Sequence, residues 1–83
     1  MAYLEDHTLY YKKLCPYCQK VFAFMEANKI TLDTRDTLAP GNQDDLIRIG
    51  GKKQVPCLVI HGKPLYESDD IIAYLREKAA EVA

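Results

Sequence analysis

Two cysteines, Cys15 and Cys18, lie two residues apart in the segment KKLCPYCQK (residues 12–20). This spacing is compatible with half of a zinc site, a structural disulfide or a redox-active thiol pair. A structural zinc site commonly uses a second closely spaced pair of ligands, and the remaining cysteine and the two histidines of this chain form no second pair of that kind. A disulfide that closes so short a loop would stabilise the fold by only about 2 kcal/mol. The residues therefore favour a redox pair, with no metal expected.

The first cysteine of the pair is predicted to be the nucleophile. Cys15 directly precedes Pro16, and proline suits the first turn of a helix, so Cys15 occupies the predicted N-cap. Free backbone N–H groups and the helix dipole favour a thiolate there, and Lys12 and Lys13 add positive charge. A lowered pKa improves departure of Cys15 from a mixed disulfide more than it improves attack. The pattern thus predicts a cysteine that rapidly forms and releases a mixed disulfide.

The second cysteine is predicted to be less exposed. Cys18 begins a helical face that continues through apolar residues at i+3, i+4 and i+7, namely Val21, Phe22 and Met25. That face is expected to be buried, which assigns Cys18 the role of resolving thiol. The third cysteine, Cys57, opens an apolar run and is interpreted as a core residue. His7 and His61 are expected to have surface or hydrogen-bonded roles.

The elements around the pair alternate between strands and helices. TLYYK (residues 8–12) and ITLDTRD (residues 30–36) are rich in branched and aromatic residues and predict two strands that flank the first helix. A right-handed crossover would make these strands parallel neighbours. NQDDLIRIGG (residues 42–51) predicts a short second helix with Asn42 as a possible cap.

The last third of the chain predicts a hairpin and a helix. CLVIH (residues 57–61) is a strand-length apolar run, and the tight turn HGKP requires an antiparallel return through Leu65 and Tyr66. SDDIIAYLREKAAEVA then predicts a helix capped by Ser68. Its expected buried stripe consists of Ile71, Ile72, Leu75 and Ala79. The predicted order is β-α-β-α-β-β-α.

The composition limits the possible functions. Eighty-three residues suit a single domain, 1–83. Eleven basic and twelve acidic side chains nearly cancel, so no overall field favours nucleic acid as a partner. No apolar run approaches the roughly 20 residues of a membrane helix, and residues 1–7 lack the features of a secretory signal. We therefore expect a cytoplasmic, monomeric protein that binds no membrane.

Taken together, these features resemble glutaredoxins within the thioredoxin fold, over about residues 8–78. The resemblance rests on CPYC, on Lys12 three residues before it, and on Val55–Pro56 ahead of the third strand. The segment LYESDDI (residues 65–71) is instead similar to glutathione S-transferase amino-terminal domains, whose relatives carry an additional helical domain. The chain is thus either a stand-alone variant or an excised domain.

The resemblance implies an α/β, thioredoxin-like architecture with a four-stranded mixed sheet and three main helices. It also implies a cis Val55–Pro56 bond, with the proline beside the active cysteines and the valine backbone pairing with the cysteinyl unit of glutathione. Glutathione carries a carboxylate at each end and an ammonium at its γ-glutamyl end. Lys12, assisted by Gln54 or Lys53, suits the glycyl carboxylate, because positive groups are needed there.

The γ-glutamyl end is assigned to the start of the last helix. Free N–H groups near Ser68 would bind its carboxylate, and Asp69 would bind its ammonium; alternatively, these two residues merely cap the helix. The full predicted glutathione site comprises Lys12, Tyr17, Gln54, Val55, Pro56, Glu67, Ser68 and Asp69.

The expected function is a glutathione-dependent thiol-disulfide oxidoreductase that reduces protein-glutathione mixed disulfides and protein disulfides, with glutathione as co-substrate. Three alternatives remain open at this point. The chain could be a redoxin reduced by a flavoprotein reductase, a module that shares an iron-sulfur cluster through Cys15 and glutathione, or a truncated transferase domain.

Overall fold

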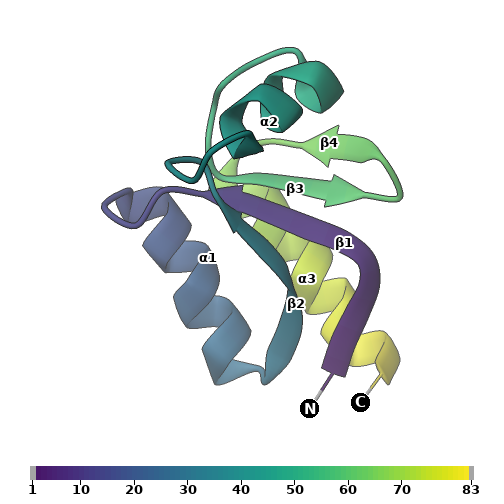
Figure 1. Cartoon of the computed structure of the whole chain (residues 1–83). Coiled ribbons are helices and arrows are strands. Elements are labelled where there is room, and N and C mark those ends of the chain that lie inside the picture. Colours follow the sequence, from purple (N-terminus) through teal and green to yellow (C-terminus); the bar gives the residue numbers. More distant parts are fainter. Residues whose placement is uncertain (1, 83) are drawn as a thin grey trace.

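The computed structural model describes residues 2–82, and its elements follow the predicted order (Figure 1). They are β1 (Ala2–Tyr11), α1 (Pro16–Ala27), β2 (Ile30–Asp36), α2 (Asn42–Gly50), β3 (Cys57–Ile60), β4 (Lys63–Leu65) and α3 (Ser68–Val82). The strands form one sheet in the order β2-β1-β3-β4. β1 is parallel to β2 and antiparallel to β3, and β3 is antiparallel to β4. The predicted four-stranded mixed sheet and three helices of the thioredoxin-like fold are confirmed.

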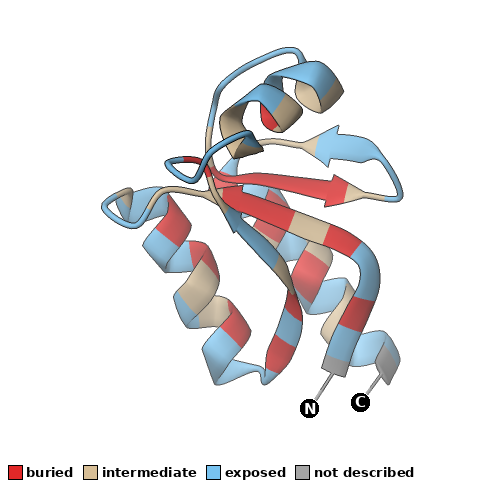
Figure 2. Cartoon of the chain, viewed as in Figure 1, coloured by how far each residue is buried: buried red, intermediate tan, exposed pale blue. Residues whose placement is uncertain are grey.

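The helices cover both faces of this sheet. α1 and α3 lie together on one face, and α2 lies across the other (Figure 1). The alternation of β-strand side chains divides the core accordingly. Leu9 and Leu58 pack with α1 and α3, while Tyr10 and Cys57 pack with Leu46 of α2. Figure 2 shows the buried positions concentrated on β1, β3 and the inward sides of the helices.

The burial of the helix faces agrees with the predicted periodicity. Cys18, Val21 and Met25 of α1 are buried, and Phe22 is partly buried against the same core. In α3, Ile71 and Leu75 are fully buried. The other two residues of the predicted stripe, Ile72 and Ala79, are partly buried and pack against this core.

The first strand is longer than predicted. β1 begins at Ala2, six residues before the expected start, and its pairing with β2 shifts between Tyr3 and Thr8. Asp6 has a left-handed backbone, with φ 60°, within this irregular stretch. The irregularity breaks the alternation on which the prediction depends, so the early part of the strand carries no clear sequence signal.

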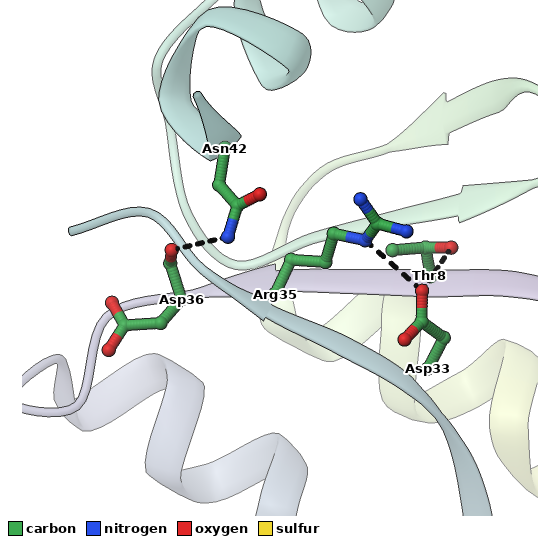
Figure 3. A network of polar contacts seen from close by, with 5 residues as sticks. All are labelled: Thr8, Asp33, Arg35, Asp36 and Asn42. Atoms are coloured by element: carbon green, nitrogen blue, oxygen red, sulfur yellow. Dashed lines mark hydrogen bonds and ion pairs between the residues drawn. The ribbon is translucent and has the colours of Figure 1, made fainter. Parts of the chain in front are cut away.

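Two predicted helix caps are wrong. Gly41, with φ 85°, is the N-cap of α2, and Asn42 is the first helical residue. Asn42 instead donates from Nδ2 to the Asp36 carbonyl oxygen at 2.9 Å (Figure 3). At α3, the Glu67 carbonyl accepts the Ile71 N–H at 3.0 Å, so Glu67 is the cap and Ser68 is the first residue of the helix.

Polar contacts fix the ends of β1 and β2 beside each other. Thr8 Oγ1 donates to Asp33 Oδ2 at 3.5 Å, and Arg35 Nε donates to the same oxygen at 3.2 Å (Figure 3). Further along, the backbone N–H and the hydroxyl of Thr37 both donate to the Tyr11 carbonyl oxygen. These bonds anchor the last residue of β1, from which the chain turns toward Cys15.

The remaining chemistry-bearing residues have structural roles. Cys57 is fully buried, as predicted. His7 is buried and hydrogen-bonds the Glu5 carbonyl and the Tyr74 hydroxyl, each at 2.7 Å, whereas His61 is exposed. Within residues 2–82, no helix is long and apolar enough to span a membrane.

Candidate functional site

Cys15 occupies the N-cap of α1, as the sequence predicts. Its backbone is extended (φ −85°, ψ 118°), and Pro16 follows in the first helical turn. The Cys15 N–H donates to the Lys12 carbonyl at 3.2 Å, and its own carbonyl accepts the Gln19 N–H at 3.0 Å. A tight turn thus connects β1 directly to the helix and leaves the Cys15 side chain partly exposed.

The pKa of the Cys15 thiol lies below its ordinary value. Burial is the largest single influence and raises this pKa, but the backbone of Cys18, the Cys18 thiol, the Tyr17 backbone and the positive charge of Lys12 together outweigh it. The Cys15 side chain makes no capping hydrogen bond in this structure. Unpaired N–H groups and the dipole at this helix N-terminus favour a thiolate at Cys15.

The pKa of the Cys18 thiol, in contrast, lies above its ordinary value. Its side chain is fully buried, and this burial raises its pKa to about 11 despite a hydrogen bond from the Lys12 backbone. The neighbouring Cys15 raises the pKa further, through a hydrogen bond between the two side chains and because two thiolates side by side would repel each other. All three cysteines of the chain are free thiols in this structure. The pair thus combines a partly exposed thiol of lowered pKa with a buried thiol of raised pKa one helical turn away.

A pocket with a volume of about 380 Å³ adjoins the start of α1. Seven of the eight predicted glutathione-site residues line it: Tyr17, Gln54, Val55, Pro56, Glu67, Ser68 and Asp69. They come from α1, from the loop before β3 and from the start of α3. The eighth, Lys12, does not line the pocket and instead acts on the charge of Cys15.

The loop before β3 contributes backbone as well as side chains to this pocket. The Val55–Pro56 peptide bond is cis, as the resemblance implies, and Pro56 is buried. Gln54 Nε2 donates to Glu67 Oε1 at 3.4 Å, which joins this loop to the turn before α3. Glu67 itself has a left-handed backbone with φ 71°, an uncommon conformation for a residue other than glycine. Such conformations cluster at binding sites.

The start of α3 presents one buried and one exposed polar side chain to the pocket. Ser68 is only 8% exposed, whereas Asp69 projects into solvent. Lys20 of α1 pairs with Asp69, with 2.5 Å between Nζ and Oδ1. Lys20 is not among the site residues that the sequence predicts. Lys20 lies three residues after Tyr17, on the same side of α1, but no local pattern in the sequence links it to Asp69.

Cys57 lies outside this pocket lining. The Tyr66 hydroxyl interacts with its sulfur, but burial dominates and raises the pKa of the Cys57 thiol. Its neighbours in the core belong to the α2 side of the sheet. Among residues 2–82, no group of three or more His, Cys, Asp or Glu side chains is arranged to hold a metal ion.

Comparisons with known proteins point to two related groups. The family described as glutathione S-transferase, N-terminal domain, matches residues 9–83. Glutaredoxin-C8 of Oryza sativa subsp. japonica is 35% identical over 86 residues, covering 94% of this chain and 62% of its own length.

Solved structures share the fold. Glutathione transferase Omega 3C from Trametes versicolor superposes with a TM-score of 0.80 at 24% identity, over 94% of this chain and 35% of the transferase. A buckwheat glutaredoxin-glutathione complex superposes with a TM-score of 0.67 at 20% identity, over 89% of this chain and 71% of that chain. This chain thus spans less than two thirds of the rice glutaredoxin and about a third of the fungal transferase. The family match extends over most of the sequence, so the chain belongs to the family of glutathione S-transferase N-terminal domains and shares its thioredoxin-like fold with glutaredoxins.

Proposed function

We propose that this chain is a glutathione-dependent thiol-disulfide oxidoreductase that acts on protein-glutathione mixed disulfides and on protein disulfides. The observation that carries the proposal is the opposite displacement of two thiol pKa values within one helical turn, lowered at Cys15 and raised to about 11 at Cys18. A glutathione transferase needs no second thiol at this position for conjugation, whereas a dithiol reductase does. The relationship to the rice glutaredoxin supports the same chemistry.

The pocket beside the thiols is proposed to hold glutathione. Its lining offers the backbone of Val55 for the cysteinyl unit and the start of α3 for the γ-glutamyl carboxylate. Lys12 lies partly buried near Cys15, where it favours the thiolate and the approach of the glycyl carboxylate. Tyr17 and Pro56, which both line the pocket, would pack against the tripeptide. The buckwheat glutaredoxin of similar fold is itself a glutathione complex.

The first reaction uses Cys15 alone. Its thiolate attacks the glutathione sulfur of a mixed disulfide, a bond forms between those two sulfurs, and the protein thiolate leaves and takes up a proton. The thiolate of a second glutathione then attacks the glutathione sulfur bound to Cys15. Oxidised glutathione is released and the Cys15 thiolate is restored, so no other oxidant or reductant is required.

The second reaction uses both cysteines. When Cys15 forms a mixed disulfide with a protein, Cys18 loses its proton, attacks the Cys15 sulfur and displaces the protein thiolate. Two glutathione molecules then reduce the Cys15–Cys18 disulfide. The high pKa of Cys18 keeps it protonated in the resting protein, so it does not compete with Cys15 for the first attack.

Matched cysteine variants test this assignment in a glutathione-coupled assay. Cys15→Ser should abolish both reactions. Cys18→Ser should preserve deglutathionylation of a glutathionylated peptide and impair reduction of a protein disulfide. Loss of both activities in Cys18→Ser would contradict the division of roles. Turnover with a flavoprotein reductase but not with glutathione would replace the proposal by the alternative redoxin.

A second candidate function is the amino-terminal part of a glutathione transferase. It is favoured by the family match and by the similarity to the Trametes enzyme, of which the shared fold covers 35%. Transferase activity would form a thioether between glutathione and an electrophile and would survive Cys18→Ser. Comparing thioether formation with disulfide reduction on the same preparation separates the two candidates.

A further inference from the structure

An ion pair connects α1 to the proposed glutathione pocket. Lys20 Nζ lies 2.5 Å from Asp69 Oδ1, and the two side chains are 53% and 82% exposed. An ion pair this exposed adds little to the stability of a fold, because water screens it and two long side chains must be held in place. Its position is the more informative feature, since Asp69 lines the pocket and Lys20 follows Tyr17 by one turn of α1.

This pairing affects how the pocket can bind the γ-glutamyl end of glutathione. Asp69 is the carboxylate proposed to take the ammonium, yet in the free protein it already has a cation within ion-pair distance. A ligand that brought only an ammonium would have to compete with Lys20. The γ-glutamyl residue, however, carries an ammonium and a carboxylate on the same carbon atom. A protein cation beside a protein anion is therefore complementary to this end of the ligand.

We infer that Lys20 is a specificity-determining residue, which binds the α-carboxylate of the γ-glutamyl unit while Asp69 binds its ammonium. The four charges would then alternate in sign, so that each has an opposite charge on both sides. Lys20 would share this carboxylate with the start of α3, where the buried Ser68 lines the pocket. The inference rests on the proposed function and adds the group that distinguishes a γ-glutamyl peptide from other thiols.

The matched ligand for a test is the α-linked isomer of glutathione, α-glutamyl-cysteinyl-glycine. It has the same mass and net charge, but its α-carboxyl group is consumed in the peptide bond. In a Cys18→Ser background, Cys15 is equilibrated with the disulfide of either tripeptide, and mass spectrometry gives the equilibrium constant for forming the Cys15 mixed disulfide. We expect Lys20→Gln to lower this constant about twofold to fivefold for glutathione, within the range of one exposed ion pair, and to leave it nearly unchanged for the α-isomer.

Control variants separate ligand binding from structure. Lys63→Gln changes the net charge equally at an exposed position on β4 and should have no effect, whereas Lys20→Arg should keep the preference for glutathione. The double variant Lys20→Asp/Asp69→Lys restores an ion pair with reversed polarity. If the ion pair had only a structural role, this double variant would recover the preference for the γ-linked peptide. We expect that it does not recover this preference.

The possible outcomes are distinct. If the protein with Lys20 intact shows no preference between the isomers, the proposed glutathione site itself is wrong. If it prefers glutathione and Lys20→Gln keeps that preference, only the role of Lys20 is overturned. A higher constant in Lys20→Gln would also overturn it, because Lys20 would then compete with the ligand for Asp69.

Discussion

Cys15 and Cys18 lie one turn apart at the start of α1, yet Cys18 is fully buried and Cys15 is partly exposed. The start of the helix accounts for the difference, because its unpaired N–H groups face Cys15 while the next turn directs Cys18 into the protein. The two thiol pKa values consequently move in opposite directions. A spacing that is symmetrical in sequence thus produces two chemically different sulfurs.

Alkylation should separate these sulfurs by pH. Cys15 should react with iodoacetamide with a midpoint below about 8.5, the ordinary pKa of a cysteine thiol, because its lowered pKa populates the thiolate at lower pH. Cys18 should stay unmodified in the same range, since burial holds its pKa near 11. Peptide mapping by mass spectrometry after alkylation at a series of pH values measures both.

Lysine variants provide the control for this profile. Lys12→Met should move the Cys15 midpoint upward, because the positive charge of Lys12 lowers that pKa. Lys63→Met, at an exposed position on β4, should leave it in place. Modification of Cys18 before Cys15 would contradict the assignment of nucleophile and resolving thiol.

The raised pKa of Cys18 should make folding stability depend on alkaline pH. Burial is the main cause of the raised Cys18 pKa, and a Cys15→Ser variant keeps Cys18 buried. The folded chain then keeps a proton that the unfolded chain releases above about 8.5, so the free energy of unfolding should fall as the pH rises from there toward 11. Urea unfolding at several pH values measures the slope. Further replacement of Cys18 by alanine should reduce this slope, and an unchanged slope would assign the effect to other groups such as Tyr66 and Cys57.

Two leucines offer a matched comparison of burial. Leu75 is fully buried in α3, whereas Leu14 is 91% exposed in the turn before Cys15. Leu75→Ala should lower the free energy of unfolding by about 2–5 kcal/mol, because it removes buried apolar contacts and leaves a cavity. Leu14→Ala should change it by less than about 0.5 kcal/mol. Denaturant unfolding of both variants tests this, and equal effects would mean that Leu14 is covered in solution.

The order of the elements could be predicted because local signals and long-range packing agree. Pro16 after Cys15 marks a helix start, and the apolar positions of α1 and α3 recur with helical spacing. The pocket was anticipated through the resemblance, which associated Tyr17 with Val55 and Ser68 although they are distant in sequence. Their convergence in one pocket follows from the sheet order and from α3 packing beside α1.

The features that were missed depend on geometry that no local pattern encodes. Asn42 is a good helix cap by residue type, but Gly41, with a left-handed backbone, is the N-cap of α2. The Asn42 side chain instead donates a hydrogen bond to the Asp36 carbonyl oxygen. The pairing of Lys20 with Asp69 joins residues 49 positions apart in the sequence and depends on how closely α1 approaches α3. Charged surface residues carry no periodic signal that would indicate such a partner.

Gly50 is required by the packing of Tyr66 and should be sensitive to the smallest substitution. A Cβ atom at Gly50 would lie 2.0 Å from the Tyr66 hydroxyl oxygen and 2.9 Å from the adjacent ring carbon. The hydroxyl donates to the Lys52 carbonyl at 3.2 Å, which ties the loop bearing Gln54 and Pro56 to the segment that leads into Glu67. Gly50→Ala should therefore displace Tyr66 and disturb both sides of the pocket.

We expect Gly50→Ala to lower the free energy of unfolding by about 1–3 kcal/mol, as overpacking usually does, and to weaken the binding of glutathione. A double-mutant cycle with Tyr66→Ala isolates the clash, because removing the ring frees the space at Gly50. In that background Gly50→Ala should be neutral or stabilising by up to about 1 kcal/mol, since alanine is the better helix former. Denaturant unfolding gives the four free energies. An equal cost of Gly50→Ala with and without the Tyr66 ring would mean that another contact, and not this tyrosine, requires the glycine.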